Sequence, residues 1–238
     1  MKKVSIIIPF YNCEYIDIAI ESALAQTYSN IEVIVVNDGA TSYAKKISPY
    51  YHLIRYIEQG NKGTAGALNT GIKAATGDYF TWLSADDVYA VDKVEKQLAY
   101  LEKMQAAIGY SSYKLIDHYG HVTNESVGVS FPTRLDFLRH LKRGCAINGC
   151  TVMMEMQLLE EFGGFDESLP FTHDYDLWVR IAEKYSFVYM DECLVSYRVH
   201  NEMGTKKHAE AIIAELANVR RKHRSMLSYV IRKERMGR

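Results

Sequence analysis

The sequence predicts an α/β fold in which a mostly parallel, Rossmann-like sheet is flanked by helices. Through the first third of the 238 residues, short β-branched runs alternate with segments of helical periodicity. Most of these runs are continuously apolar, which is typical of strands that helices cover on both faces. A hydrophobic content of 48% is ample for the core of such a domain.

The first half of the chain yields four expected strands and two expected helices. The strands are VSIII (4–8), EVIVV (32–36), LIRYIE (53–58) and YFTWL (79–83). The first helix is indicated by apolar residues that recur on one face, at Ile16, Ala19, Ile20, Ala23 and Leu24. The second is expected from Thr64 to Ala75, closed by Gly77. Alternation at this spacing implies parallel strands joined by right-handed crossovers.

The second half is less regular. It holds a helix near 91–104, the run IGYSSYKLID (108–117), a turn at DHYG, a helix near 134–142 and the run CAINGCTVMMEM (145–156). No Pro/Ser-rich linker or repeat separates the halves. We therefore expect one domain over residues 1–205, made of halves 1–88 and 89–205, followed by a basic helical tail at 206–238.

Charge is distributed unevenly along the chain. Residues 218–238 contain eight Lys or Arg and one acid, which leaves 20 basic and 28 acidic residues in 1–217, a net charge of −8 there. This basic segment, interleaved with apolar residues, suits either an anionic membrane surface or a solvated helix, and both interpretations stay open. Nucleic acid is not an expected partner because no nucleic-acid-binding module accompanies the tail.

We expect a cytoplasmic location, with the tail as a peripheral contact at the inner face of the cell membrane. No apolar run approaches the roughly 20 residues that cross a bilayer, and the opening MKKVSIIIPF is too short and Pro-interrupted for a signal peptide. The four cysteines show no C-x-x-C spacing, so free thiols in a reducing compartment are expected.

Acidic residues follow two of the predicted strands. Asn37-Asp38-Gly39 ends the second strand and Asp86-Asp87 follows the fourth, while the first ends on Pro9-Phe10-Tyr11. Turn formation, helix capping or packing explains each alone, but the carboxyl ends of parallel strands share one ligand-binding edge. No glycine-rich phosphate loop is present. The charge of a bound diphosphate could instead be neutralised by a hard cation such as Mn²⁺ or Mg²⁺, which carboxylates hold.

The ordered motifs resemble those of the inverting GT-A glycosyltransferases of family 2, over roughly residues 3–200. The resemblance is carried by VSIIIPFYNCEYIDIAIESALAQTY, EVIVVNDGATS, NKGTAGALNTGIKAATGDYFTWLSADD, NGCTVMM, GGFDESL, HDYDLWVRIAEKY and YRVH. It implies a nucleotide-binding half at 1–88 and an acceptor and catalytic half at 89–205. The chain departs from the family at Asn37 and Ser84, where an acid is common, and at Leu68, where an arginine is common.

The resemblance also implies roles for individual residues. Nucleotide-sugar contacts fall to Pro9, Tyr11, Asp38, Asn69 and Asp86. Within the acidic pair, Asp86 is directed to the ribose or sugar and Asp87 to the metal. A metal-ligand role for His200, the last residue of YRVH, is weighed against an ordinary structural histidine. Asn148 and Gly149 resemble the acceptor-side motif, with a turn or bulge as the alternative, and His173 is either an acceptor contact or exposed.

Inverting transfer needs a general base for the acceptor hydroxyl. If residues 174–185 form a helix, Asp174 falls on its inward stripe and Asp176 nearly opposite. Spacing alone leaves Asp174 as either a helix cap or a functional group. The resemblance decides for Asp174, because the first Asp of HDYDLW matches the family's catalytic base. Asp176 is then structural, pairing with Arg180.

These expectations describe a metal-dependent inverting glycosyltransferase of hexosyl or N-acetylhexosaminyl type. A UDP-sugar is the expected donor, and cell-surface polysaccharide or glycoconjugate synthesis the expected setting. Partners are the donor, a saccharide or lipid-linked acceptor, and a second copy of the chain. A sugar-1-phosphate nucleotidyltransferase is the alternative enzyme, although it should carry a Gly-rich, Arg/Lys-bearing loop where this chain has PFYN. A catalytically silent nucleotide-sugar binding protein is the other alternative.

Overall fold

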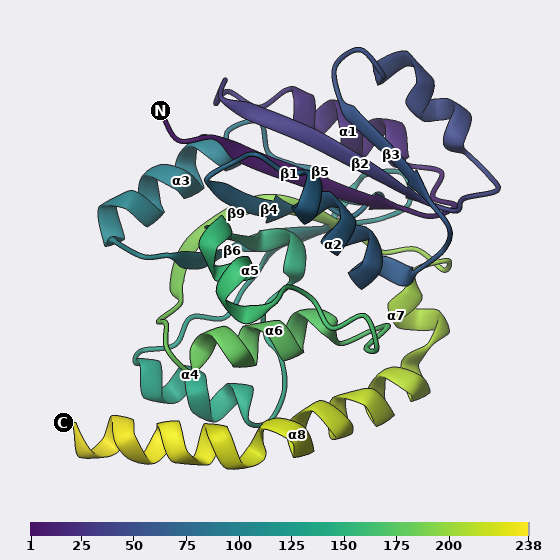
Figure 1. Cartoon of the computed structure of the whole chain (residues 1–238). Helices are drawn as coiled ribbons and strands as arrows, with labels where there is room; N and C mark the ends of the chain where they lie inside the picture. The colour runs from purple at the N-terminus through teal and green to yellow at the C-terminus, as the bar shows by residue number, and fades with distance from the viewer. Residues whose placement is uncertain (238) are drawn as a thin grey trace.

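One nine-stranded sheet organises residues 1–237, which the computed structural model describes apart from the side chain at position 205. Arg238, the last residue of the basic tail, lies outside the described residues. The strand order is β3-β2-β1-β4-β8-β6-β9-β5, with β7 added beside β6. Helices pack on both faces of this sheet, with α1 behind it and α2 in front in the view of Figure 1.

The first four predicted strands are confirmed as parallel neighbours, β2 pairing with β1 and β3, and β1 with β4. Strands β1, β2 and β4 form because continuous runs of Val, Ile and aromatic residues are buried between helices, whereas β3 is a half-exposed edge strand. The elements of this half are β1 (Val4–Phe10), α1 (Ile16–Leu24), β2 (Ile31–Asp38), the 3₁₀ helix η1 (Ala44–Tyr50), β3 (Arg55–Gln59), α2 (Gly63–Ala74) and β4 (Tyr79–Trp82).

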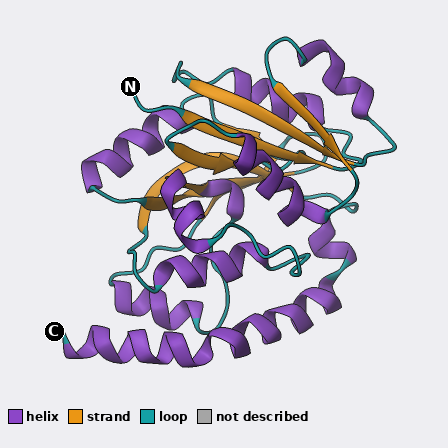
Figure 2. Cartoon of the chain, viewed as in Figure 1, coloured by secondary structure: helices purple, strands orange, loops and turns teal. Residues whose placement is uncertain are grey.

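The second half adds antiparallel pairs, so the complete sheet is mixed. Strand β8 runs antiparallel to both β4 and β6, and β5 runs antiparallel to β9. Its elements are β5 (Val88–Tyr89), α3 (Lys93–Met104), β6 (Ile108–Ile116), β7 (Val122–Val127), α4 (Arg134–Leu141), η2 (Gly149–Thr151), β8 (Val152–Glu155), α5 (Met156–Phe162), α6 (His173–Ala182), β9 (Val188–Arg198), α7 (Gly204–Lys207) and α8 (Ala209–Met236). Figure 2 shows the strands gathered above, with α4, α6 and α8 of this half below them.

Gly77 does not close α2 as predicted. The helix ends at Ala74, and Ala75 is already extended. Gly77 instead passes beside β1, where its N–H donates to Ser5 Oγ at 3.0 Å. A Cβ at this position would lie 2.4 Å from the same oxygen, so glycine is required by close approach of two chain segments rather than by a helix cap.

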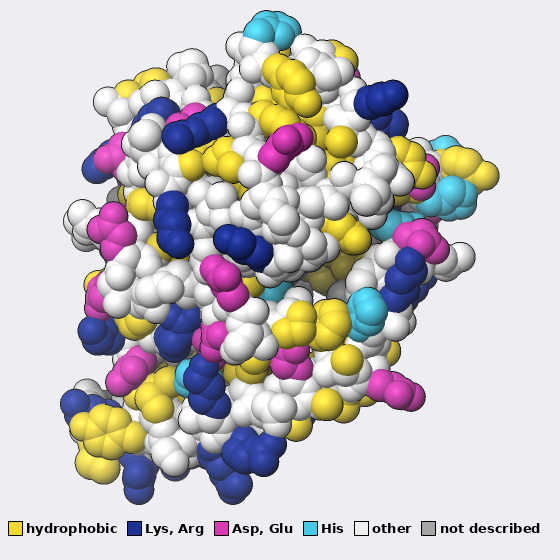
Figure 3. Space-filling view, turned by 45° about the vertical axis from the view of Figure 1, so that its right-hand side comes forward, with side chains coloured by type: hydrophobic (Ala, Val, Ile, Leu, Met, Phe, Trp, Pro, Cys, Tyr) yellow, Lys and Arg dark blue, Asp and Glu magenta, His cyan; other side chains and the backbone are white. Residues whose placement is uncertain are grey.

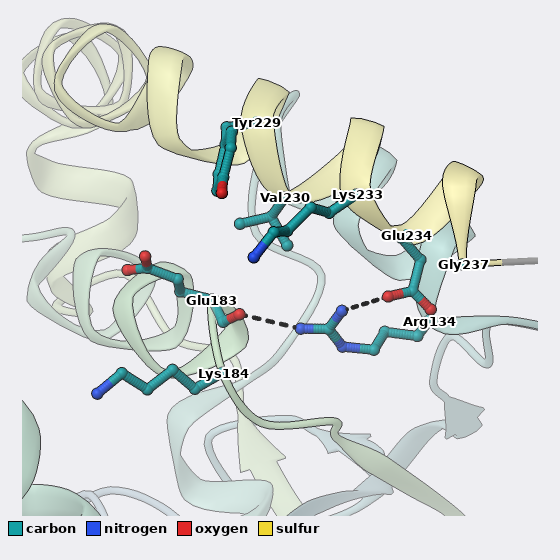
Figure 4. Close-up of a pocket in the computed structure, with 8 residues that line it drawn as sticks. All are labelled: Arg134, Glu183, Lys184, Tyr229, Val230, Lys233, Glu234 and Gly237. Atoms are coloured by element: carbon teal, nitrogen blue, oxygen red, sulfur yellow. Dashed lines mark hydrogen bonds and ion pairs between the residues drawn. The ribbon is translucent and has the colours of Figure 1, made fainter.

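Helix α8 is the long helix along the bottom of the molecule in Figure 1, beneath α4 and α6. Val219, Leu227, Val230 and Ile231 are buried in the same hydrophobic core as the sheet. At its far end, Arg134 of α4 joins Glu234 at 2.6 Å and the carbonyls of residues 182 and 183 (Figure 4). The basic tail is therefore packed onto the second half of the chain. None of the helices within residues 1–237 combines the length and apolarity needed to cross a membrane.

Lys93, at the start of α3, is a fully buried lysine. Its Nζ donates to Thr81 Oγ1 and lies 4.3 Å from the centre of the Tyr89 ring. No salt bridge joins it to an acid within residues 1–237. Burial lowers the pKa of Lys93 to about 7, because a dry environment disfavours the ammonium form.

We expect Lys93→Met to raise the free energy of unfolding at pH 7 by about 2–4 kcal/mol. Between the folded pKa of about 7 and the unfolded value of 10.5, the unfolded chain binds more protons, so wild-type stability rises with pH. The advantage of the variant therefore shrinks as the pH approaches 10. Urea unfolding at several pH values measures this. Lys103→Met, an exposed change on the same helix, is the control and should show little effect and no such pH dependence.

Candidate active site

The carboxyl ends of β1, β2 and β4 carry the predicted donor-site residues to one edge of the sheet. Register places Phe10 of β1 beside Asn37 of β2, so Tyr11 and Asp38 leave the sheet side by side. Tyr11 is 53% exposed and available to a ligand, whereas Asp38 is buried. Parallel pairing of β4 with β1 brings Asp86 and Asp87 to the same edge. The structure thus gathers Tyr11, Asp38, Asp86 and Asp87 as the strand-end rule requires.

Asp38 fixes the loop between β3 and α2. Its Oδ1 accepts hydrogen bonds from Gln59 Nε2 at 2.7 Å and from the Lys62 backbone N–H at 2.8 Å. Gly39 follows in a left-handed conformation, with φ of 75°, which lets the chain turn sharply away from β2. The Asp38 carboxylate therefore stands in a rigid setting at the edge where a nucleotide would bind.

Asn69 is grouped with a different loop. Its amide nitrogen donates to the Phe165 carbonyl at 2.8 Å and to Glu167 at 2.9 Å, while its oxygen accepts from the Phe165 N–H at 3.0 Å. The Asn69 amide thus ties α2 to the GGFDESL segment. Its contact with the nucleotide sugar stays a prediction. The hydrogen bonds to residues 165–167 show that the same amide also holds two segments of the fold together.

The acidic pair is held by Arg198, the last residue of β9. The Arg198 backbone N–H donates to Asp87 Oδ1 at 2.9 Å, and its Nε donates to the Asp86 carbonyl at 2.9 Å. The guanidinium also lies 4.3 Å from the Tyr15 ring centre, a cation–π distance. Sequence reasoning missed this residue, although a basic side chain at a strand end, two positions before His200, was an available signal.

His200 contacts Asp86 rather than Asp87. Its Nε2 lies 3.0 Å from Asp86 Oδ2, and both side chains are partly buried. The structure therefore brings together a residue predicted to bind metal and the aspartate predicted to bind the sugar nucleotide. The metal-ligand role of His200 stays a prediction.

Asp87 is a buried carboxylate with one oxygen free to bind a cation. It is 1% exposed, and its Oδ2 has no hydrogen-bond partner. Burial, followed by the neighbouring charge of Asp86, raises the pKa of Asp87 well above its ordinary value. No group of three His, Cys, Asp or Glu within the described part of the chain forms a metal cage. Because Mg²⁺ is often held by one or two carboxylates together with substrate phosphates, the acidic pair fits a hard cation shared with a diphosphate.

Asp174 is the second residue of α6 and is half-buried. Its Oδ1 accepts a hydrogen bond from the Tyr175 N–H at 2.7 Å, a bond that fixes the side chain at the helix start. Burial raises the pKa of Asp174 above its ordinary value, which moves it in the direction suited to a base near neutral pH. The helix-cap and functional interpretations therefore apply to the same side chain.

Asp176 does not lie on an open face of α6. Its side chain is fully buried and bonds to Arg180 at 2.8 Å, Lys222 at 2.9 Å and His223 at 2.7 Å. The expected pairing with Arg180 is confirmed, but the face opposite the inward stripe is covered by α8. Burial alone would raise the pKa of Asp176; His223, Lys222 and Arg180 together hold it far below the ordinary value. This carboxylate anchors α8 to α6.

Glu215 of α8 holds the segment that leads into α6. Its Oε1 accepts from the Phe171 N–H at 3.0 Å, the Thr172 N–H at 2.6 Å and the Thr172 hydroxyl at 2.7 Å. These bonds satisfy donors at the helix start that would otherwise lack partners, two residues before Asp174. Sequence reasoning missed Glu215 because no local pattern relates it to a segment 43 residues earlier.

Trp82, His173 and Gly149 connect the two halves of the site. The His173 ring, which is buried rather than exposed, lies 5.6 Å from the Trp82 ring. A Cβ at Gly149 would lie 2.3 Å from that indole, so the acceptor-side motif needs glycine to let its backbone rest on Trp82. Trp82 Nε1 and both His173 nitrogens have no partner. These buried polar groups lie between the strand of the acidic pair and the helix of Asp174.

Comparison with known proteins gives relatives along most of the chain. A glycosyltransferase of Rickettsia bellii is 43% identical over 214 residues, 86% of this chain and 31% of the relative. The Escherichia coli protein named UDP-Glc:alpha-D-GlcNAc-diphosphoundecaprenol beta-1,3-glucosyltransferase WfgD is 33% identical over 188 residues, 76% of this chain and 70% of the relative. The chain spans 31–65% of the length of five Rickettsia relatives.

A solved structure and a family model match as well. The crystal structure of S. aureus TarS 1-349 in complex with UDP-GlcNAc superposes with a TM-score of 0.69 at 18% identity, over 91% of this chain and 65% of that one. This likeness confirms the predicted GT-A fold, with its mixed sheet flanked by helices. The model described as Glycosyl transferase family 2 matches residues 5–161. The chain therefore belongs to glycosyltransferase family 2.

Proposed function

We propose that this protein is a metal-dependent inverting glycosyltransferase that moves a hexosyl or N-acetylhexosaminyl group from a UDP-sugar to a hydroxyl of a lipid-linked or saccharide acceptor. The observation that carries the proposal is the separation of two acidic groups: Asp86 and Asp87 at the sheet edge, and half-buried Asp174 on α6. A UDP-glucose-dependent relative and a fold neighbour solved with UDP-GlcNAc support the choice of donor. The setting we propose is cell-surface polysaccharide or glycoconjugate synthesis.

The chemistry assigns a separate role to each acidic group. Asp174 accepts the proton of the acceptor hydroxyl as its oxygen bonds to the anomeric carbon. The bond from that carbon to the diphosphate oxygen breaks on the opposite face, its electron pair leaves with UDP, and the configuration inverts. A cation bound by Asp87, with His200 and Asp86 beside it, would neutralise the charge that develops on the diphosphate. Tyr11 and Asp38 hold the nucleotide at the same edge.

A thermal-shift screen tests the donor assignment. UDP-glucose, UDP-GlcNAc and GDP-mannose would each be added with Mn²⁺ or with EDTA. At a donor concentration 100 times Kd, stabilisation is about 2.7 kcal/mol. We expect a rise in Tm for a UDP-sugar only in the presence of Mn²⁺. A shift with GDP-mannose alone, or equal shifts in EDTA, would contradict the donor or the metal assignment respectively.

Glu215 provides a further prediction for this reaction. Burial is the main cause of the raised pKa of Asp174, and the negative charge of Glu215 adds a small contribution in the same direction. Glu215→Gln keeps an acceptor oxygen for the Thr172 N–H but removes the charge, so the Asp174 pKa should fall. Activity should then persist to lower pH, with the acidic limb of the kcat profile displaced by a few tenths of a pH unit. An unmoved limb would show that Glu215 acts on stability alone.

We also propose a cytoplasmic location, with α8 lying peripherally against the inner face of the cell membrane. Exposed arginines at positions 220, 221, 224, 232 and 235 line this helix, and Figure 3 shows Lys and Arg side chains gathered at the lower end of the molecule. Basic side chains near an anionic lipid surface attract it by about 1 kcal/mol each. A lipid-linked acceptor would make this contact useful.

A further inference from the structure

A hollow of about 370 Å³ lies between α8 and the end of α4, lined by Lys142, Ala217, Arg220, Arg221 and Arg224. It is termed the basic pocket. Four of its five lining residues are cations and none is an acid. Its volume is within the range of about 300–1,000 Å³ that is usual for small-molecule sites. This lining suits a ligand with more than one negative charge.

A second cavity at the far end of α8 shows that the basic lining is not general along this helix. That cavity, about 490 Å³ in volume, includes Glu183 and Glu234 among its lining residues. Two of its three cations are paired with acids, Arg134 with Glu234 at 2.6 Å (Figure 4) and Lys184 with Glu161 at 2.7 Å, while Lys233 lies over the Tyr229 ring. Opposite charges thus offset one another there, while the charges of the basic pocket are not offset by any lining acid.

The basic pocket lies close to the helix that bears Asp174. The Tyr175 hydroxyl donates to the carbonyl of Leu141, the residue before Lys142. Arg220 donates to the Arg143 carbonyl at 3.1 Å, so α8 is fixed to the same segment. Glu215, between one and two helical turns before Arg220, holds Thr172. Hydrogen bonds from α6 and α8 to the same segments therefore hold the basic pocket next to the start of α6.

We propose that the basic pocket binds the diphosphate of a lipid-linked acceptor. This inference rests on the proposed function and deepens it by naming the acceptor class. Guanidinium groups bind phosphate oxygens through paired, charge-assisted hydrogen bonds, and three arginines and a lysine more than offset the negative charge of a diphosphate that joins a lipid to a sugar. A diphosphate held there would place the attached sugar beside α6, where Asp174 receives the hydroxyl proton. The lipid would extend along the face of α8 that we propose to lie against the membrane.

Vesicle flotation of the full chain, without any donor, tests the pocket. The vesicles would be phosphatidylcholine alone, with farnesol, with farnesyl diphosphate, or with phosphatidylglycerol at matched charge. The pocket variant is Arg220→Gln/Arg221→Gln/Arg224→Gln, and Lys142→Gln changes the opposite wall. Lys45→Gln/Lys73→Gln/Lys103→Gln is the control, because it removes the same charge from exposed positions on η1, α2 and α3, outside α8.

We expect wild type and the control variant to bind farnesyl diphosphate vesicles, and the pocket variant to bind them at least about tenfold more weakly. Lys142→Gln should weaken this binding in the same direction. Equal losses in the pocket and control variants, or equal binding to phosphatidylglycerol, would overturn the site in favour of a diffuse membrane contact. Because no donor is present, the donor thermal shift of the wild type reports on the proposed function separately.

Discussion

Replacing Asp174 with Asn is expected to lower kcat by about 10²–10⁴-fold, the usual contribution of a general base, while UDP-sugar binding survives. The amide can still accept the hydrogen bond that Tyr175 N–H donates at 2.7 Å, so the start of α6 should keep its geometry. It cannot accept the proton of the acceptor hydroxyl. Single-turnover kinetics and calorimetric titration with UDP would separate the two effects.

Asp176→Asn is the matched control for this experiment, because it makes the same chemical change two residues along the same helix. The buried Asp176 carboxylate pairs with Arg180, Lys222 and His223, so its replacement should lower Tm rather than impair the chemical step. Near-wild-type turnover by Asp174→Asn would give the role of base to another acid.

Replacing Asp87 with Asn is expected to abolish the metal dependence of donor binding. The Asn oxygen can accept the hydrogen bond from the Arg198 N–H, now 2.9 Å from Asp87 Oδ1, so the fold should be retained. A cation would lose its charged ligand, and loss of a metal-supporting residue costs about 10–100-fold in affinity even outside the first coordination sphere. Calorimetry with UDP should therefore give the same weak affinity in Mn²⁺ and in EDTA.

The apoprotein gives a control for this variant. Burial and the Asp86 charge both disfavour ionised Asp87, so the neutral Asn should leave the Tm of the apoprotein unchanged or raised. An affinity that still depends on Mn²⁺ in Asp87→Asn would remove Asp87 from the metal site and direct attention to the pair of His200 and Asp86.

Local sequence patterns could predict the features that depend on residues close together in the sequence. The first four strands are recognisable as short β-branched runs. The residues that follow their carboxyl ends include Tyr11, Asp38, Asp86 and Asp87, which are identified without knowledge of distant contacts. The periodicity of α6 also places Asp174 near the site. Each of these features depends on residues within a few positions of one another, where periodicity and turn chemistry apply.

Contacts between distant segments could not be predicted in this way. Arg198 organises Asp87 across 111 positions of sequence, and Lys222 and His223 reach Asp176 across 46 and 47 positions. The periodicity of α6 predicts that Asp176 faces away from the core, because periodicity reflects packing against a single surface. Helix α8 supplies a second surface, with buried Val219 and Leu227 among its arginines.

The stereochemistry of the product tests the central claim most directly. Purified protein would be supplied with Mn²⁺, a UDP-α-sugar and a lipid-linked diphosphate acceptor, and the anomeric configuration of the new linkage would be read by NMR. Attack with Asp174 as base on the face opposite UDP predicts a β-linked product from the α-linked donor. An α-linked product would contradict the account, because retention requires a different use of these carboxylates.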